Sequence, residues 1–535
     1  MAIPRWNPRQ EPTKQERFIL KRLKRVRKLF AFLRMHRHEL FDDAFQDKLE
    51  SMYRQCGAGK KPLPPAMLAM AVLVQGYLGL SDAEMVELTV MDLRVQMVLG
   101  ILGQTEPPFS QGALCSFRAR LIWHDMDRCL LERTVELARN TKEFDFKKLP
   151  GTLRVAIDSC PLEGAGKVED TVNLLGHAAG KVVDCVAGLL DWTRSEVCME
   201  AGVPVLMESS VKKALDVDWS DPKQKAKALK VLTLELDALQ SWLRDNLPEE
   251  LAEPPLQEHV ETLEQLCAQD LEPDPEGGGS RIRKGVAPDR RPSVEDAEMR
   301  HGRKSKTKLF NGYKRHVAAD VDVDLIYAAV ATPANRPEEE ATPALQEDME
   351  EQDVKADELY IDRAYINSQL VEDVLSRKGE VICKPWIARN GSRFSKRDFN
   401  INVRSKIITC PAGHTERFDF GTAVEFNSDF CDHCAIREQC TAAELGHGRS
   451  VSIAENERLQ KRLRKLQNTK KGRERLRRRT GIEHRLAHIA RRQGKRARYL
   501  GTRKNTFDLR RASAIQNLET IQRRVEGPAK KVANL

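Results

Sequence analysis

No apolar stretch in this sequence of 535 residues reaches the ~18 residues that a membrane-spanning helix needs. The first thirty residues are interrupted by charge throughout, so they lack the apolar segment of a secretory signal. Charged residues make up 31% of the chain and its mean hydropathy is −0.52, which excludes a membrane-embedded protein. We therefore expect a cytoplasmic protein without a membrane partner.

Disulfide bonds are also not expected, because cytoplasmic thiols stay reduced. The twelve cysteines are better explained as free thiols or metal ligands. No internal repeat is evident. A hydrophobic fraction of 41% is enough for packed cores, and the chain is too long for one ordinary domain, so we expect about three or four domains.

Most of the chain has no excess of positive charge. The excess is concentrated in its C-terminal segment. Residues 449–535 contain 27 Lys and Arg against 7 Asp and Glu, an excess of +20. The whole chain carries +10, so residues 1–448 sum to −10. So basic a segment predicts a polyanionic partner, since each cation that meets a phosphate releases condensed counterions. The alternative is a solvated helical face.

Helix signals dominate the first part of the chain. Residues 13–37 place apolar side chains at helical spacing among ten Lys and Arg, which predicts a basic amphipathic helix. A second helix is predicted after the Pro-rich KKPLPP and ends near Gly79. Ser81 and Glu84 then form a capping-box signal, in which each side chain bonds the other residue's backbone N–H, and this predicts another helix.

A further start signal is Ser110, which opens a predicted helix to about Trp123 that carries Arg118 and Arg120. Helices separated by short turns are compatible with a DNA-binding module whose last helix enters the major groove. A plain helical bundle fits the same spacing equally well.

Short β-type runs follow the helices. Strands are predicted at 153–158, 313–319, 325–332, 358–362 and 380–386. Helical stretches near 337–351 and 366–377 separate the later ones. This alternation predicts an α/β core with a mixed sheet.

Two long insertions are expected in that core. About 140 residues after the first strand contain predicted helices near 178–195, 222–245 and 254–270. They end in EPDPEGGGSRIRKGVAPDRRPS, which is too rich in Gly, Pro and charge to pack and predicts a flexible connector. The second insertion occupies residues 390–480, before the basic helical tail.

Two aspartates lie at the carboxyl ends of predicted apolar strands, Asp158 after the first and Asp362 after the fourth. Side chains that leave such strand ends converge at one edge of an α/β sheet. A carboxylate there is costly to bury unless something pairs with it, and a divalent metal is a natural partner. The alternative is that each aspartate caps the helix or turn that follows it.

Glu483 is the sole acid between Arg475 and Asn505, among apolar residues at helical spacing. By charge patterning it would be an i,i+4 partner of an arginine. It could equally face inward as a metal ligand.

Several segments carry motifs in a specific order: AIDS at Asp158, GRKSKTKLFNGYKRHVAAD from Gly302, TPAN at Thr332, YIDRAY around Asp362, and GIEHRLAHIARRQGKRARYLGTRKN from Gly481. Together they resemble insertion-sequence transposases with an Asp-Asp-Glu catalytic triad, in the branch with a helical N-terminal transposase domain. The resemblance spans roughly residues 60–160 and 300–525 and leaves out the helical insertion. It implies a ribonuclease H-like core.

The resemblance also implies that Asp158, Asp362 and Glu483 hold two Mg²⁺ or Mn²⁺ ions roughly 4 Å apart, which serve both DNA cutting and strand joining. Related enzymes have an arginine four positions before the catalytic glutamate, and Arg479 matches. They often have a tyrosine three positions before that arginine and a lysine seven after the glutamate. Leu476 and Ala490 stand there instead, so the signature is only partly kept.

Basic residues are expected to contact DNA, and those near the carboxylates would position phosphates, with His316 as a further contributor near the site. The alternative for the lysine-rich segment is a solvated basic loop. The expected contacts are Arg118, Arg120, Lys304, Lys306, Lys308, Lys314, Arg315, Arg479, Arg491 and Arg492.

A cysteine cluster lies in the second insertion. Cys410 is followed, after twenty residues, by the segment CDHCAIREQC with Cys431, Cys434 and Cys440. Two thiolates two residues apart can share one zinc ion, and the other two cysteines could complete a tetrahedral, zinc-ribbon-like site. His414 competes as the fourth ligand. Four unligated thiols are the alternative in a reducing compartment.

We therefore expect a nucleoid-associated DNA transposase that acts on terminal inverted repeats and target DNA, as a homodimer when assembled on DNA. A non-catalytic, domesticated DNA-binding protein and a nuclease that never joins ends are the alternatives. The expected domains are a helical DNA-binding domain at 1–145, core segments at 150–164 and 301–390, the helical insertion and linker at 165–300, the cysteine-rich insertion at 391–445, and the basic helical end of the core at 446–535.

Overall fold

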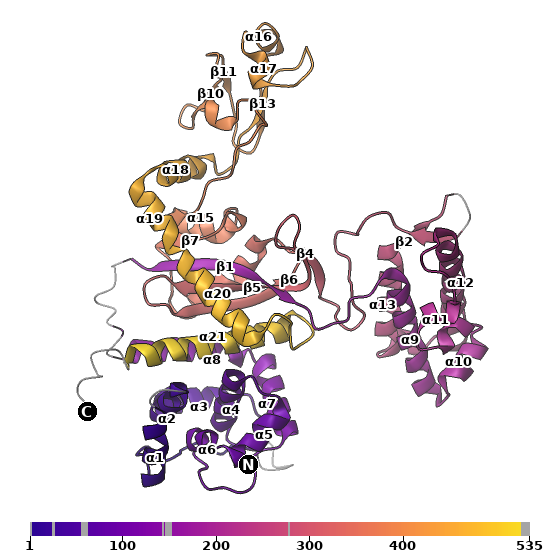
Figure 1. The fold of residues 1–535 in the computed structure, drawn as a ribbon, viewed down its shortest axis with the longest axis vertical. Coiled ribbons are helices and arrows are strands. Elements are labelled where there is room, and N and C mark those ends of the chain that lie inside the picture. Colours follow the sequence, from indigo (N-terminus) through magenta and orange to yellow (C-terminus); the bar gives the residue numbers. More distant parts are fainter. Residues whose placement is uncertain are drawn as a thin grey trace.

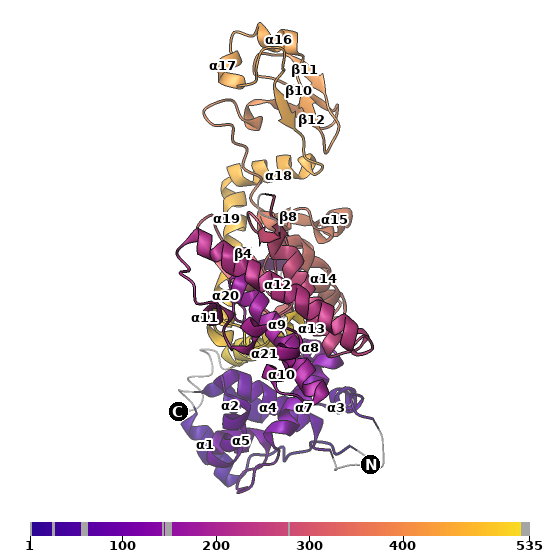
Figure 2. The same cartoon turned by 90° about the vertical axis from the view of Figure 1, so that its right-hand side faces the viewer.

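The structure is a computed structural model that describes residues 3–23, 27–54, 62–141, 144, 152–275 and 279–525. Figure 1 shows the N-terminal helices at one end, a sheet in the middle, and two insertions that project from the sheet in different directions. Figure 2, turned by 90°, shows the cysteine-rich insertion at the end of the molecule opposite the N-terminal helices.

The N-terminal region is helical, as the sequence predicts. Ser81 and Glu84 form the expected capping box, and the Ser110 side chain accepts a hydrogen bond from Ala113 N. The single helix predicted over 13–37 is wrong, because Arg27 adopts a left-handed conformation that separates two helices. The helices are α1 (Lys14–Arg22), α2 (Lys28–Leu40), α3 (Asp43–Glu50), α4 (Pro65–Leu78), α5 (Asp82–Met91), α6 (Leu93–Leu99), α7 (Gln111–Trp123) and α8 (Met126–Asn140).

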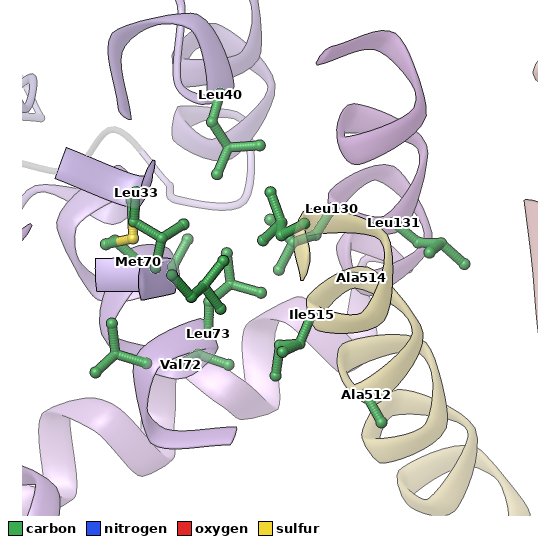
Figure 3. Packing of buried hydrophobic residues seen from close by; sticks show 14 of the residues in the cluster. Leu33, Leu40, Met70, Val72, Leu73, Leu130, Leu131, Ala512, Ala514 and Ile515 are labelled. Atoms are coloured by element: carbon green, nitrogen blue, oxygen red, sulfur yellow. The ribbon is translucent and has the colours of Figure 1, made fainter. Parts of the chain in front are cut away.

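Helix α4 is apolar on all sides and almost wholly buried, as expected of a helix inside a core. Figure 3 shows Met70 and Leu73 of α4 in the same cluster as Leu33 of α2 and Ile515 near the C-terminus. Among helices of the described residues, none alone is long and apolar enough to cross a membrane. Only α4 and α5 together satisfy length and composition, and they are bent by 104°.

The predicted mixed sheet is confirmed. Its strands follow the order β4-β5-β1-β7-β8, and β6 pairs with β5. The pairs that β5 makes with β1, β4 and β6 are antiparallel, while β7 is parallel to both β1 and β8. The strands are β1 (Arg154–Glu163), β4 (Arg300–Arg303), β5 (Leu309–Asp320), β6 (Ile326–Pro333), β7 (Glu358–Tyr360) and β8 (Glu380–Ile382).

Strand β1 is longer than predicted, so Asp158 lies within the strand and not at its carboxyl end. The antiparallel register with β5 runs from Val155 opposite Asp320 to Glu163 opposite Gly312. This long partner supplies backbone hydrogen bonds beyond Asp158 and keeps the chain extended. The Asp158 side chain therefore stands on a face of the sheet, whereas Asp362 does follow the end of β7.

Alternation along β1 assigns its side chains to two faces. Ala156 belongs to the hydrophobic cluster that contains α21 (Thr502–Val525), while Val155 and Ile157 belong to a cluster with α14 (Thr342–Glu350) and α15 (Gln369–Ser376). Asp158 consequently shares the α21 face. Helix α21 is buried along nearly its whole length and lies between the sheet and the N-terminal helices (Figure 1), so one core joins the two regions.

The helical insertion has a hydrophobic cluster of its own. The three predicted helices are present, with two short ones between them: α9 (Thr171–Leu190), α10 (Arg194–Glu200), α11 (Val211–Leu215), α12 (Pro222–Asn246) and α13 (Leu256–Asp270). The expectation that the following connector cannot pack is wrong for its second half. Arg290 donates to Asp270 at 2.7 Å, and Arg291 is buried and donates to Ser293 O at 2.8 Å, so both guanidinium groups have partners within the protein.

Three basic helices return from the cysteine-rich insertion to the sheet: α18 (Glu457–Asn468), α19 (Lys470–Arg478) and α20 (Thr480–Gln493). Helix α20 packs against β1 and α21. The insertion has a small core of its own, which includes Phe399, Ile408 and Phe426. Its elements are β9 (Asn400–Asn402), β10 (Ile407–Thr409), β11 (Thr415–Arg417), β12 (Ala423–Glu425), α16 (Ser428–Asp432), α17 (Arg437–Cys440) and β13 (Ser450–Ser452).

Short elements complete the chain. The hairpin β2 (Leu271–Pro273) and β3 (Ser280–Ile282) follows α13. The 3₁₀ helices are η2 (Pro204–Met207), η3 (Glu250–Ala252), η4 (Glu338–Ala341), η5 (Arg363–Tyr365) and η6 (Lys396–Asp398).

Candidate active site

Three carboxylates come from β1, the end of β7 and the first turn of α20. Asp158 stands on the face of β1 against which α20 packs. Asp362 caps η5, because its Oδ1 accepts a hydrogen bond from Arg363 N at 2.7 Å. Glu483 lies in the first turn of α20 with its side chain 51% exposed.

Arg479 joins two of these carboxylates. It stands at the junction of α19 and α20, where its Nη1 donates to Asp158 Oδ2 at 2.8 Å and its Nη2 donates to Glu483 Oε1 at 2.7 Å. The i,i+4 arginine partner predicted for Glu483 is therefore present. The same guanidinium reaches Asp158, 321 positions earlier in the chain.

Asp158 feels the charges of both other acids. Burial raises the pKa of Asp158, and the negative charges of Asp362 and Glu483 raise it further. Arg479 and the Ser159 N–H oppose this rise, since both favour the ionised carboxylate. Asp158 is thus a half-buried acid whose charged form is favoured by a neighbouring cation.

A divalent cation suits this set of donors by chemistry and by charge. Carboxylate oxygens are the ligands that Mg²⁺ prefers in proteins. Two of the three acids already converge on one cation, the Arg479 guanidinium. The Arg479 side chain lies between Asp158 and Glu483. Within the described ranges, no three His, Cys, Asp or Glu side chains are arranged to hold a metal ion.

The predicted lysine-rich segment forms the turn between β4 and β5, where Lys304, Lys306 and Lys308 are exposed. Burial raises the pKa of Cys160, two residues after Asp158, while Arg315 and Lys304 lower it. Lys304 therefore lies near Cys160 on β1.

Other predicted DNA contacts are engaged with protein groups. Lys314 pairs with Glu338 at 3.0 Å, and Arg492 pairs with Glu519 at 2.7 Å. Arg120 and Arg491 are exposed, with the Arg120 guanidinium 4.6 Å from the centre of the Tyr53 ring.

For Arg118 and Arg315 a direct DNA contact does not fit the structure. Arg118 is 9% exposed and donates to both Asp82 oxygens, at 2.8 and 2.6 Å, so it ties α7 to α5. Arg315 is 1% exposed and donates to the carbonyls of Pro161 and Gly494. Both cations serve the fold.

A buried polar network lies on the other face of the sheet. The His316 ring has its Nδ1 2.8 Å from the Tyr365 hydroxyl and its Nε2 2.9 Å from Thr332 Oγ1. Burial and the nearby Lys314 lower the pKa of His316 to about 3, so the ring is neutral at neutral pH. The TPAN and YIDRAY motifs contained Thr332 and Tyr365, but sequence spacing gave no sign that these residues meet His316.

The four clustered cysteines line one small cavity of about 30 Å³, together with His414. Burial raises the pKa of Cys440, and its three partners Cys431, Cys410 and Cys434 also affect it electrostatically, so the sulfurs lie near one another. Each is a free thiol. The His414 ring stacks on Phe430, with ring centres 4.6 Å apart.

Two segments of the chain match known protein families. Residues 409–522 match the family model described as "Transposase DDE domain". Residues 21–120 match the one described as "Transposase domain (DUF772)". The comparisons with curated proteins and with solved structures find no match. The first segment contains Arg479 and Glu483, and the second contains the N-terminal helices up to Arg120.

Proposed function

Because this chain belongs to the insertion-sequence transposases with a DDE domain, we propose that it cuts DNA at the ends of its element and joins those ends to target DNA. The catalytic residues in this proposal are Asp158, Asp362 and Glu483. The observation that carries it is the ion pair of Arg479 with both Asp158 and Glu483. This ion pair brings residues that are far apart in the sequence together at β1, the strand next to β7, and Asp362 follows β7.

Mg²⁺ or Mn²⁺ would be held by the three carboxylates. When bound, two such ions would activate the attacking water or DNA 3′-hydroxyl and stabilise the leaving oxygen. Burial of Asp158 makes an uncompensated negative charge costly, which favours a cation at this position. The planar guanidinium of Arg479 can instead pair with a phosphate oxygen of the DNA. The exposed Lys304, Lys306 and Lys308 can contact phosphates next to it.

We propose a ribonuclease H-like core for this site. The antiparallel arrangement of β6, β5 and β1, followed by the parallel β7 and β8, supports it. So does the placement of Asp158 on β1, of Asp362 just after the adjacent strand β7, and of Glu483 on a helix that packs against β1.

The proposed partner is double-stranded DNA, at the terminal inverted repeats and at the target site, bound by a homodimer that assembles on DNA. Exposed arginines and lysines on α18, α19 and α20 provide the phosphate contacts. The N-terminal helices are proposed to contribute to this binding, with Arg120 exposed on α7.

A structural zinc ion is proposed at Cys410, Cys431, Cys434 and Cys440. The shared cavity supports it, because all four cysteines line it and thiolates are ligands that zinc prefers. Metal analysis of the purified protein should find about one zinc per chain, and a Cys434→Ser variant should lose it. Zinc-free wild-type protein that is fully folded would contradict the site.

The function is tested by incubating the protein with DNA that carries the ends of its own element, plus Mg²⁺ or Mn²⁺. Nicks at the ends together with joined products are the expected result. Nicks without joined products would indicate a nuclease. Tight, salt-dependent binding without either product would indicate a non-catalytic DNA-binding protein.

A further inference from the structure

A chain of buried hydrogen bonds lies behind the carboxylates, on the opposite face of the sheet. His316 and Tyr365 are 0% and 1% exposed. The Tyr365 hydroxyl lies 2.8 Å from His316 Nδ1, and Thr332 Oγ1 lies 2.9 Å from His316 Nε2. The two rings meet edge to face, with centres 6.1 Å apart. None of these three residues touches DNA in the proposed function.

The Tyr365 hydroxyl connects the two segments that carry the aspartates. Ser159 lies directly opposite His316 in the β1–β5 register, and its side chain lies near the Tyr365 hydroxyl, where it lowers the pKa of that group. Ser159 is the neighbour of Asp158 in β1. Tyr365 ends the turn η5, which begins at Asp362. The Tyr365 hydroxyl thus ties the turn after Asp362 to His316, the residue that pairs with the neighbour of Asp158 in β1.

The donors and acceptors of this chain can all be satisfied in one direction. Tyr365 donates to His316 Nδ1, and His316 Nε2–H donates to Thr332 Oγ1. This arrangement requires a neutral imidazole. A directional chain in a buried environment also resists rearrangement, because any missing partner would leave a buried polar atom unsatisfied.

We propose that Tyr365 and His316 are positioning residues that set the separation of Asp158 and Asp362 and so adjust the site for its divalent cations. This rests on the proposed function, since it concerns the same carboxylates. Groups behind metal ligands orient them, and their loss typically lowers metal affinity or activity about 10-fold to 100-fold. The network is in the right place for this role, because it touches the backbone segments of both aspartates.

The test compares two buried tyrosines in the full-length protein. Tyr365→Phe removes the hydroxyl behind the carboxylates. Tyr327→Phe is the matched control. This tyrosine is 3% exposed and lies on β6 of the same sheet, and its hydroxyl donates to Asp320 Oδ2 at 2.9 Å. Asp320 is not one of the three proposed catalytic carboxylates. Mn²⁺ affinity is measured by calorimetry, along with kcat and DNA affinity in the cleavage reaction and the melting temperature.

Tyr365→Phe should weaken Mn²⁺ binding and lower kcat by roughly 10-fold or more, with DNA affinity unchanged. Tyr327→Phe should lower the melting temperature to a similar extent and leave Mn²⁺ affinity and kcat unchanged. If Tyr365→Phe does not fold, Thr332→Val, which removes the other partner of His316, should show a smaller loss of Mn²⁺ affinity in the same direction.

The positioning role is overturned if the test variant, Tyr365→Phe or its replacement Thr332→Val, has the same Mn²⁺ affinity and kcat as the control Tyr327→Phe. The proposed function fails in a different way. In that case the wild-type protein itself does not cut its DNA ends, or its Mn²⁺ affinity is the same in a Glu483→Gln variant.

Discussion

The basic end of the chain contains two regions that use their arginines in opposite ways. Helices α18 to α20 expose most of theirs, whereas α21 buries Arg510 and Arg511 between the sheet and the N-terminal helices. Arg510 of α21 is 7% exposed, and it donates to Asp125 at 2.6 Å and to Asp348 at 2.8 Å. Asp125 lies between α7 and α8 of the N-terminal region, and Asp348 lies on α14 beside the sheet.

The difference shows that a charge count does not locate a DNA-binding surface. The excess of +20 in residues 449–535 includes Arg510 and Arg511, whose charges are balanced by acids inside the protein. Helices α18 to α20 expose cations that can face a phosphate backbone: Arg458, Lys461, Arg462, Lys465, Lys470, Lys471, Arg473, Arg477, Arg478 and Arg491.

The largest expected effect is on chemistry at α20. Glu483→Gln removes the carboxylate charge but keeps the side-chain shape, so folding and DNA affinity should persist while the cleavage rate falls by about three orders of magnitude or more. Glu519→Gln on α21 is the matched control and should cut at the parental rate. A Glu483→Gln enzyme that cuts as fast as the wild type would leave Glu483 as a mere partner of Arg479.

The next effect is on stability at α21. Arg510→Met leaves the buried Asp348 without its cation, and should lower the free energy of unfolding by about 3–5 kcal/mol. The same change at the exposed Arg491 of α20 should cost no more than about 0.5 kcal/mol. Urea denaturation of both variants measures this. Equal losses would mean that the two helices do not differ in the way described.

A pH effect should accompany the buried pair. Burial raises the pKa of Asp348 to about 6, with Arg510 opposing the rise, and its unfolded value is near 3.8. The folded state therefore binds a proton more readily than the unfolded state, and this group's contribution to stability is lost as the pH rises from about 4 to about 6. The loss should reach at most about 3 kcal/mol.

Urea denaturation at several pH values tests this effect against Asp348→Asn, which should lack that part of the pH dependence. The same slope in both proteins would assign it to other groups.

The smallest effect is on DNA binding. Replacing Arg477, Arg478 and Arg491 with alanine should weaken affinity and reduce the slope of log affinity against log salt by about 0.9 for each lost phosphate contact. Arg523→Ala, an exposed arginine of α21, should leave the slope unchanged. Binding titrations at several salt concentrations measure both. An effect of Arg523 as large as that of the α19 and α20 arginines would extend the DNA surface onto α21.

Part of the candidate site was predictable because it depends on local signals. Strand patterns, helical spacing and a family resemblance predict Asp158, Asp362 and Glu483 as site residues. The spacing to Glu483 predicts Arg479. The roles of these residues stay a prediction. The contact of Arg479 with Asp158 was not predictable, because no spacing rule relates residues 321 positions apart.

The sequence by itself determined the capping boxes, the helices of the insertion and the mixed sheet, since these depend on hydrogen bonds and periodicities within a few neighbouring residues. Only the tertiary structure decided that β1 continues past Asp158, that Arg118 pairs with Asp82, and that α21 is buried. Strand length depends on the partner strand, and the fate of a charge depends on which acids the fold places beside it.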